Sequence, residues 1–179
     1  MSTPAETVQF WRDAGPKQWF AKDEAFDAAI RTRFEAAHHA AARGEFAAWE
    51  ESAEGAFALL LLLDQFPRNL FRGSAHAFAT DPIARNVASR AIARRFDQSF
   101  SGDERIFFYL PFEHSEDARD QARAIALMSS IGNAEYVKFA QVHADIIARF
   151  GRFPHRNDAL GRESTPEERD FLAHGGFKG

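Results

Sequence analysis

The chain has 179 residues, with 22 Lys and Arg against 26 Asp and Glu and no cysteine. This length suits one domain, residues 1–179, with a hydrophobic core of its own. The absence of cysteine excludes disulfides, thiolate nucleophiles and iron–sulfur clusters. The net charge of −4 gives no general attraction to nucleic acid or anionic lipid, so any anion-binding capacity must be local.

The first third of the chain carries several helix signals. Thr3-Pro4-Ala5-Glu6 is a capping box, in which threonine and glutamate side chains bind backbone N–H groups of the first turn. Asp23 is suited to cap a second helix. A third helix is expected over residues 52–66. Its five consecutive leucines leave no polar face, so we expect it to be the most buried helix and to end at Pro67.

The later part of the chain also contains residues that are typical of helix ends. Pro111 is expected to break a short aromatic helix, and Ser115 to cap the helix that follows. Asn133 is suited to cap a long helix that Gly151 ends, and Thr165 begins a second capping box. No stretch alternates between apolar and polar residues over the length of a strand. We therefore predict an all-α, single-domain array of about eight helices.

Two segments of the sequence resemble each other, LLLDQFPRNLFRG at residues 61–73 and IIARFGRFPHRNDALGR at residues 146–162. Each is an apolar helix that reaches Phe-Pro and continues with Arg, Asn and a further Arg. One interpretation is structural, because a helix stopped by proline leaves carbonyl groups that Arg and Asn side chains can bind. The other is functional, with two arginine-bearing corners that converge on one pocket.

A third polar segment, PFEHSE, occupies residues 111–116. Glu113 beside His114 is suited to general acid–base catalysis, because each group alters the proton affinity of the other. Together with Glu116 they could equally provide ligands for a divalent metal. The structural alternative is that Ser115 and Glu116 stabilise a helix N-terminus while Glu113 pairs with an arginine.

Two further polar residues interrupt apolar helices. Asp64 follows the five leucines, so its carboxylate should be at least partly buried and paired, and Arg68 is the nearest candidate partner. His143 lies on an apolar helix face, where a satisfied core histidine is more common than a ligand. The catalytic candidates are thus Glu113 and His114. The candidates for ligand binding are Asp64, Arg68, Asn69, Arg72, Glu116, His143, Arg152, His155, Arg156, Asn157 and Arg162.

Several functional classes lack their motifs. The sequence has no GxSxG, Walker A, GxGxxG or HExxH pattern, and it identifies no metal ligand set and no cofactor. His38 and His39 fit an exposed helix face. Basic residues alternate with acidic ones, which disfavours nucleic-acid binding, and no apolar stretch approaches the roughly 20 residues that span a bilayer. We therefore expect a cytoplasmic protein with neither nucleic acid nor membrane as partner.

The motifs LDQFPRN, PFEHSE and RFGRFPHRN…GRESTPEE together resemble the uncharacterised bacterial family named domain of unknown function 924. The resemblance runs nearly end to end, from the stretch between Trp19 and Phe34 to the last capping box. It implies an all-helical architecture similar to tetratricopeptide-repeat folds, although the sequence shows no 34-residue repeat of its own. The family brings no established activity, substrate or catalytic residue.

Three functions follow as hypotheses. The first is a helical binding module whose arginine-lined polar pocket captures a small anion or an acidic peptide. The second is a small hydrolase in which Glu113 and His114 act as acid and base, with or without a metal, while arginines stabilise negative charge. The third is a scaffold in which the ion pairs are purely structural and partner proteins dock elsewhere. The sequence leaves open whether copies of the chain assemble.

Overall fold

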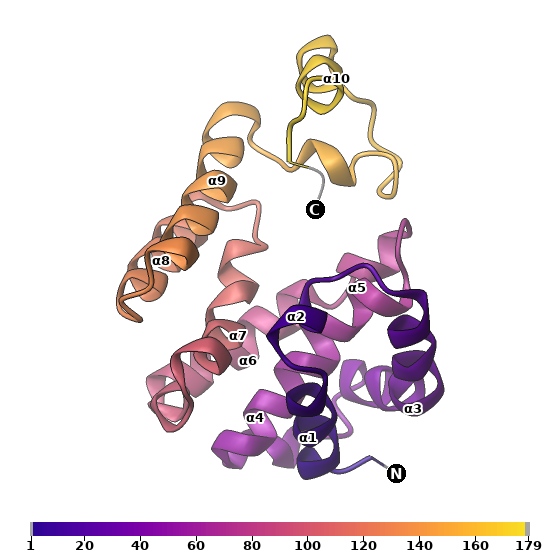
Figure 1. Cartoon of the computed structure of the whole chain (residues 1–179), viewed down its shortest axis with the longest axis vertical. Helices are drawn as coiled ribbons and strands as arrows, with labels where there is room; N and C mark the ends of the chain where they lie inside the picture. The colour runs from indigo at the N-terminus through magenta and orange to yellow at the C-terminus, as the bar shows by residue number, and fades with distance from the viewer. Residues whose placement is uncertain (1, 178–179) are drawn as a thin grey trace. The chain divides into compact units, whose positions relative to one another are not determined.

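The computed structural model describes residues 2–177, and within this range it contains helices and turns but no strand (Figure 1). Eight of the described α-helices have seven or more residues, which confirms the prediction of an all-α array. The α-helices are α1 (Pro4–Ala14), α2 (Pro16–Trp19), α3 (Glu24–Ala42), α4 (Ala53–Leu60), α5 (Phe66–Leu70), α6 (Asp81–Ala93), α7 (Gly102–Glu113), α8 (Ala118–Ser129), α9 (Ala134–Phe150) and α10 (Pro166–Ala173). Short 3-10 turns are η1 (Ala47–Glu51), η3 (Ala75–Phe78), η4 (Phe96–Ser99) and η5 (Pro154–Arg156).

The chain divides into two compact units. The first unit runs as far as Arg72 and resumes over His76–Pro111, and the second comprises Gly73–Ala75 and the chain from Phe112 onward. The polar segments identified in the sequence are shared between these units. Asp64 to Arg72 belong to the first, whereas Glu113 to Arg162 belong to the second. The single domain remains a prediction.

The centre of the first unit is an apolar helical segment that does not end where the sequence predicts. α4 passes into a π-helical turn, η2 (Leu61–Gln65), and then directly into α5. The five leucines are almost completely buried, as expected. Pro67 does not stop the helix, although it has no N–H to donate. The carbonyl of Leu63, four residues back, accepts instead from the hydroxyl of Thr80 at 2.6 Å. The wide π turn lets Phe66 donate its N–H to the carbonyl of Leu61, five residues back.

Aromatic side chains fill the rest of the core of this unit. Trp11 on α1 is fully buried and stacks on Trp19 of α2, with ring centroids 5.9 Å apart. The same indole contacts the edge of Phe107 on α7 and the ring of Phe66 on α5. One ring thus joins four helices, so the phenylalanines of this unit act chiefly as core residues.

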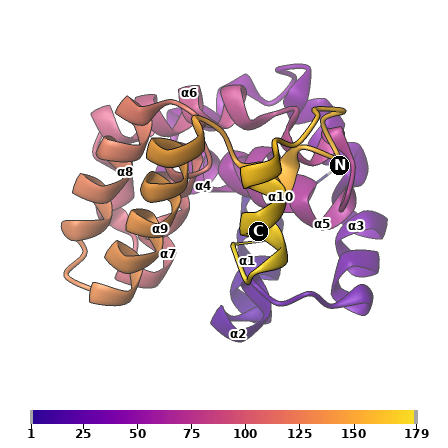
Figure 2. The ribbon, with the colours of Figure 1, turned by 90° about the horizontal axis from the view of Figure 1, so that it is seen from above.

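In the second unit α8 lies beside α9 (Figure 2). Two sequence predictions about the segment that precedes α8 are wrong. Pro111 sits inside the last turn of α7, which continues to Glu113, so the loss of one helical N–H is tolerated there. Ser115 does not cap α8, because Asp117 is the N-cap and accepts from the N–H of Arg119. The serine hydroxyl instead accepts from the N–H of Asp117 and donates to the carboxylate of Asp120.

Most local helix signals are confirmed. Thr3 and Thr165 both form complete capping boxes, and Asp23 and Asn133 both cap their helices through the side chain. Gly151 ends α9 in the left-handed conformation, with φ of 70°, as a glycine after a helix commonly does. Across residues 2–177, no helix combines the length and the apolar character needed to cross a bilayer.

Candidate functional site

The first unit holds a buried acid–arginine group next to the π turn. Asp64 is fully buried, and Arg68 lies 3.4 Å from its carboxylate, which confirms the predicted pairing. Arg68 also donates to the Asp64 carbonyl at 2.5 Å, so it binds a carbonyl in the way the structural interpretation of the Phe-Pro-Arg-Asn segment requires. Its guanidinium then makes two hydrogen bonds, of 2.9 and 3.1 Å, to Asp81 at the start of α6. Two carboxylates therefore share this one cation.

Asn69 and Arg72 converge on a single acid, Asp27 of α3. Arg72 donates to both carboxylate oxygens, at 2.5 and 2.9 Å, and the Asn69 amide donates at 2.7 Å. These residues line an open groove of about 400 Å³ between α3 and α5. The charged lining of the groove is balanced, since Glu24 and Asp27 match Arg31 and Arg72. It therefore offers no excess of positive charge.

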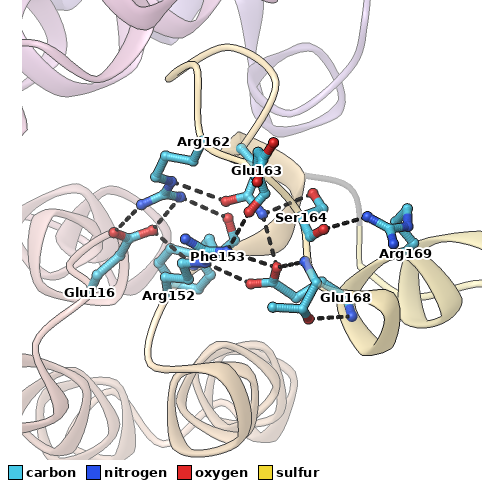
Figure 3. Close-up of polar contacts among 10 residues, drawn as sticks. Glu116, Arg152, Phe153, Arg162, Glu163, Ser164, Glu168 and Arg169 are labelled. Carbon is cyan, nitrogen blue, oxygen red and sulfur yellow. Dashed lines mark hydrogen bonds and ion pairs between the residues drawn. The ribbon is translucent and has the colours of Figure 1, made fainter.

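The second unit contains a continuous ion-pair network, shown in Figure 3. We use this term for five side chains: Glu116, Arg152, Asn157, Arg162 and Glu168. They come from the loop before α8, the segment after α9 and the first turn of α10, and they bind one another in sequence. Two carboxylates face two guanidiniums within the network, so its formal charge is zero.

One end of the network holds the backbone of Phe153. Glu116 accepts from the Phe153 N–H at 2.8 Å and pairs with Arg162 through both oxygens, at 2.8 and 3.0 Å. Arg162 in turn donates to the Phe153 carbonyl at 3.1 Å. Hydrogen bonds from the paired charges stabilise the ionised carboxylate, and the pKa of Glu116 is lowered despite its partial burial, which acts in the opposite direction.

The other end of the network is built on the second capping box. Glu168 is buried and accepts from the N–H of Thr165, from Arg152 at 2.6 and 2.8 Å, and from the amide of Asn157 at 3.2 Å. The bond from Arg152 is the main cause that lowers the pKa of Glu168 to about 2. Asn157 is fully buried and also accepts from Arg162 at 3.0 Å, so it joins the two ion pairs.

Beside the network lies a second group, the histidine cluster, which we define as Glu113, His114, His143, His155 and Arg156. Its best-defined contact joins Glu113 at the end of α7 to His143 in the middle of α9, with Oε1 and Nδ1 3.1 Å apart. Both side chains are buried, being 5 % and 9 % exposed. The sequence suggested His114 as the acid–base partner of Glu113, and the structure adds His143 from a distant helix.

Phe153 connects the members of the histidine cluster. The ring of His143 meets Phe153 edge-on at 5.6 Å, and His155 contacts the same phenyl ring at 5.5 Å. The guanidinium of Arg156 lies over it at 4.6 Å, and Arg156 is 7 % exposed. The ring of His114, which is half-buried, lies 6.5 Å from that of His143. The network that fixes the backbone of Phe153 therefore also fixes the ring on which the cluster is assembled.

The surroundings of His155 hold its imidazole in the uncharged form. Burial is the largest cause of a pKa lowered to about 3, followed by the positive charge of Arg156 and the neighbouring His143 and His114, while Glu116 acts weakly in the opposite direction. His155 is therefore neutral at pH 7. Its Nδ1 is buried and has no hydrogen-bond partner among the described residues.

Sequence reasoning missed the acids that complete these groups. Asp27, Asp81 and Glu168 each pair with a predicted arginine, but they lie between 13 and 45 residues away along the chain. The sequence indicates Glu168 only as the acidic residue of the second capping box. The interpretation of His38 as exposed is wrong, because α3 turns it inward, where Nδ1 bonds to the Leu62 carbonyl at 2.8 Å. Among residues 2–177 no group of three His, Asp or Glu side chains is placed to hold a metal ion.

The comparison with protein families is decisive for identity. The model of a bacterial protein family of unknown function, DUF924, matches residues 7–176. The chain belongs to this family. The resemblance drawn from the three motifs is thereby confirmed, and residues of both the ion-pair network and the histidine cluster fall inside the matched region. The likeness to tetratricopeptide-repeat folds remains a prediction.

A solved structure supports the fold. A protein of unknown function from Agrobacterium tumefaciens is 56 % identical in sequence and superposes with a TM-score of 0.93. The match covers 96 % of this chain and 97 % of that chain. No curated protein matches the chain. The family and its fold are thus established, and a function has to be argued from the side chains.

Proposed function

We propose that the protein is a helical binding module and that the histidine cluster of its second unit captures a small anion. The observation that supports this most is the buried Nδ1 of His155, which has no hydrogen-bond partner among the described residues. Beside it, the positive charge of Arg156 is, after burial, the next cause that lowers the pKa of His155 to about 3. An anion placed there would be stabilised by the same field that disfavours a proton on His155.

The arginines outside the cluster serve a different purpose in this proposal. Arg152 and Arg162 already bind carboxylates within the second unit, and Arg68 and Arg72 do so within the first. A ligand would have to displace an internal carboxylate to reach any of them. These four arginines are therefore left out, and the anion is placed at His155, beside the positive charge of Arg156.

The chemistry of the cluster suits a compact oxyanion, such as a carboxylate or inorganic phosphate. A neutral imidazole has one N–H that can donate to an oxyanion, and a guanidinium adds further donors in a planar arrangement. Burial strengthens each of these hydrogen bonds, because the local dielectric is lower than in water. The fixed backbone of Phe153 keeps the donors in place before the anion arrives, which reduces the entropy cost of binding.

Calorimetric titration with inorganic phosphate and with succinate tests this proposal. The wild type should bind at least one of them, and His155→Gln and Arg156→Gln should each weaken binding by about tenfold or more, which corresponds to the loss of one charge-assisted hydrogen bond. The matched control is Arg149→Gln, which removes the same charge from an exposed position on α9. Equal weakening by Arg149→Gln, or no binding by the wild type, would contradict the proposal.

A further inference from the structure

We propose that the groove between α3 and α5 binds a small zwitterion, a compound whose ammonium and carboxylate groups are a few bonds apart. All the residues that line this groove belong to the first unit, so the site goes beyond the proposed function and does not depend on it. Its volume of about 400 Å³ lies within the range of roughly 300–1,000 Å³ that is typical of small-molecule sites.

One face of α3 supplies most of the lining of the groove. Asp27 and Arg31 follow Glu24 by three and seven residues, a spacing that places all three on the same side of a helix. α3 lies beside α5 (Figure 1), from which Asn69 completes the lining together with Arg72, just beyond the end of that helix. The ionisable groups along α3 therefore succeed one another in the order acid, acid, arginine.

The charges of this lining do not fully compensate one another. Arg72 binds both carboxylate oxygens of Asp27, so these two groups are paired. Arg31 pairs with Glu35, one turn further along α3, at 3.3 Å. The side chain of Glu24 makes no hydrogen bond or ion pair with any other residue in the range 2–177. One negative charge is therefore left at the start of α3, and it attracts a cation.

Asn69 offers a second acceptor for that cation. The residue is 7 % exposed, and its amide nitrogen donates to Asp27 at 2.7 Å. Because the nitrogen must face this carboxylate, the amide oxygen is directed away from it. The oxygen accepts no hydrogen bond from the described part of the chain, although an amide oxygen on so buried a side chain normally has a partner. An ammonium group in the groove would supply the missing donor.

Arg31 provides donors for the negative end of the ligand. A guanidinium has five N–H groups. Arg31 uses one of them toward Glu35 and another toward the carbonyl of Leu70, so three are left. Its side chain is half exposed, and its ion pair with Glu35 is a single contact. A carboxylate in the groove can therefore bind Arg31 without displacing an internal acid.

The order of the charges favours a zwitterion over simpler ions. A plain anion bound at Arg31 would be repelled by Glu24, whereas a polyamine bound at Glu24 would extend its next ammonium group toward Arg31. The two residues are separated by two helical turns, which is about 10 Å along the axis of α3. Hydrogen bonds of about 2.8 Å at both ends leave about 5 Å for the ligand. An extended 4-aminobutyrate molecule has this length.

NMR titration of the full-length protein with 4-aminobutyrate tests the site. Butyrate, which lacks the ammonium group, and 4-aminobutanamide, which lacks the carboxylate, are the matched probes. The zwitterion should shift the backbone amide signals of Ala28, Thr32 and Leu70, which line the groove. It should bind about tenfold more tightly than either probe, because each probe loses one charge-assisted hydrogen bond. Equal affinity for either probe, or no binding of 4-aminobutyrate, would overturn the proposal.

Two substitutions examine the two ends of the ligand separately. Glu24→Gln should weaken the binding of 4-aminobutyrate about tenfold. It should leave the melting temperature nearly unchanged, since the Glu24 side chain has no partner among the described residues. Arg31→Gln should weaken the binding of 4-aminobutyrate without weakening that of 4-aminobutanamide, which has no carboxylate to bind. Binding of 4-aminobutyrate by Glu24→Gln as tightly as by the wild type would refute the site.

Matched control variants exist for both positions. Glu54→Gln removes another exposed acid from the first turn of a helix, α4, outside the groove. Arg43→Gln removes an exposed arginine that pairs with Glu45 just after α3. Neither control should change the affinity for 4-aminobutyrate, and an effect as large as that of Glu24→Gln or Arg31→Gln would show attraction by net charge alone.

The same spectra distinguish this proposal from the proposed function. Signals of the second unit, from residue 112 onward, should stay in place when 4-aminobutyrate is added. Shifts confined to the second unit would place the zwitterion at the histidine cluster and overturn the groove as its site. Absence of phosphate or succinate binding would contradict the proposed function and leave the groove unaffected.

Discussion

At the scale of single residues, the second unit contains two carboxylates that are kept ionised and one histidine that is kept neutral. Glu168 and Glu116 keep their negative charge because each accepts hydrogen bonds from an arginine and from a backbone N–H. His155 is forced to stay neutral because it is partly buried among positive neighbours. The free energy of unfolding should therefore depend on pH in two distinct steps.

The first step concerns His155. Its pKa is lowered from 6.5 to about 3 in the folded protein by burial, Arg156, His143 and His114, against the weak opposing effect of Glu116. The unfolded state thus binds the proton more tightly, and the stabilisation is complete above pH 6.5 and decreases as the pH falls toward 3. We expect a loss on the order of 1 kcal/mol per pH unit across this range. Denaturant melts between pH 7 and 5 should show a flatter dependence for His155→Gln.

The second step belongs to the carboxylates and has its own pH range. The pKa values of Glu116 and Glu168 are lowered from 4.5 in the folded protein, so their stabilisation is present above that pH. It decreases below that pH because the carboxylates of the unfolded state then take up protons while those of the folded state are still ionised. Loss of stability that began only below pH 4.5 in the wild type would contradict the role assigned to His155.

At the scale of elements, the sequence predicts helix ends well and misses interactions that arise from packing. Thr3, Thr165 and Asn133 form the predicted caps because a cap involves only residues of the first turn. Ser115 is not the N-cap of α8, because the helix begins later and Asp117, two residues further on, is its N-cap. The sequence also misses the passage through Pro67, because no local sequence signal marks the rare π turn that precedes it.

The candidate site follows the same rule. Asp64 and Arg68 are four residues apart, and their pairing was predictable from helix geometry alone. The contact of Glu113 with His143 joins two helices across 30 residues, and no periodicity in one sequence reveals such a pair. The sequence therefore names most members of the ion-pair network and the histidine cluster, but not the partners that lie on other helices.

The two capping boxes provide a matched comparison of local and networked carboxylates. Glu6 and Glu168 both occupy the third position of a box, but only Glu168 is buried and also binds Arg152 and Asn157. Glu168→Gln should therefore destabilise the protein by about 3 kcal/mol, as the breaking of a buried ion pair does. Glu6→Gln should have a much smaller effect because the box at Thr3 is exposed. Thermal melts of the two variants test this, and equal melting temperatures would show that the network contributes nothing beyond the cap.

At the scale of the whole molecule, the division into two compact units raises the question of whether they unfold together. Each unit has its own buried residues: the leucines and Trp11 in the first, and Ile146, Ile147 and Phe153 in the second. Contiguous groups of this kind often open with different free energies. Hydrogen exchange resolves the opening of each unit separately.

Two substitutions allow a test of this question. Gly55→Ala in α4 would place a Cβ 2.1 Å from the carbonyl oxygen of Trp49 and destabilise the first unit by about 1–3 kcal/mol. Glu168→Gln acts in the second unit. We expect each variant to accelerate amide exchange mainly within its own unit. Equal acceleration in both units by either variant would show one cooperative domain, as the sequence analysis predicts.

The hydrogen bonds from Glu116 and Arg162 to the backbone of Phe153 have a consequence for proteolysis. The segment from residue 149 to 162 contains four arginines and would be cut readily by trypsin in an unfolded chain. A protease must draw an arginine side chain into its specificity pocket and bind the flanking backbone in an extended form. Here Arg152 and Arg162 are occupied by carboxylates, Arg156 is buried, and both backbone polar groups of Phe153 are bound by side chains. We therefore expect trypsin to cut slowly at these three arginines while the second unit stays folded.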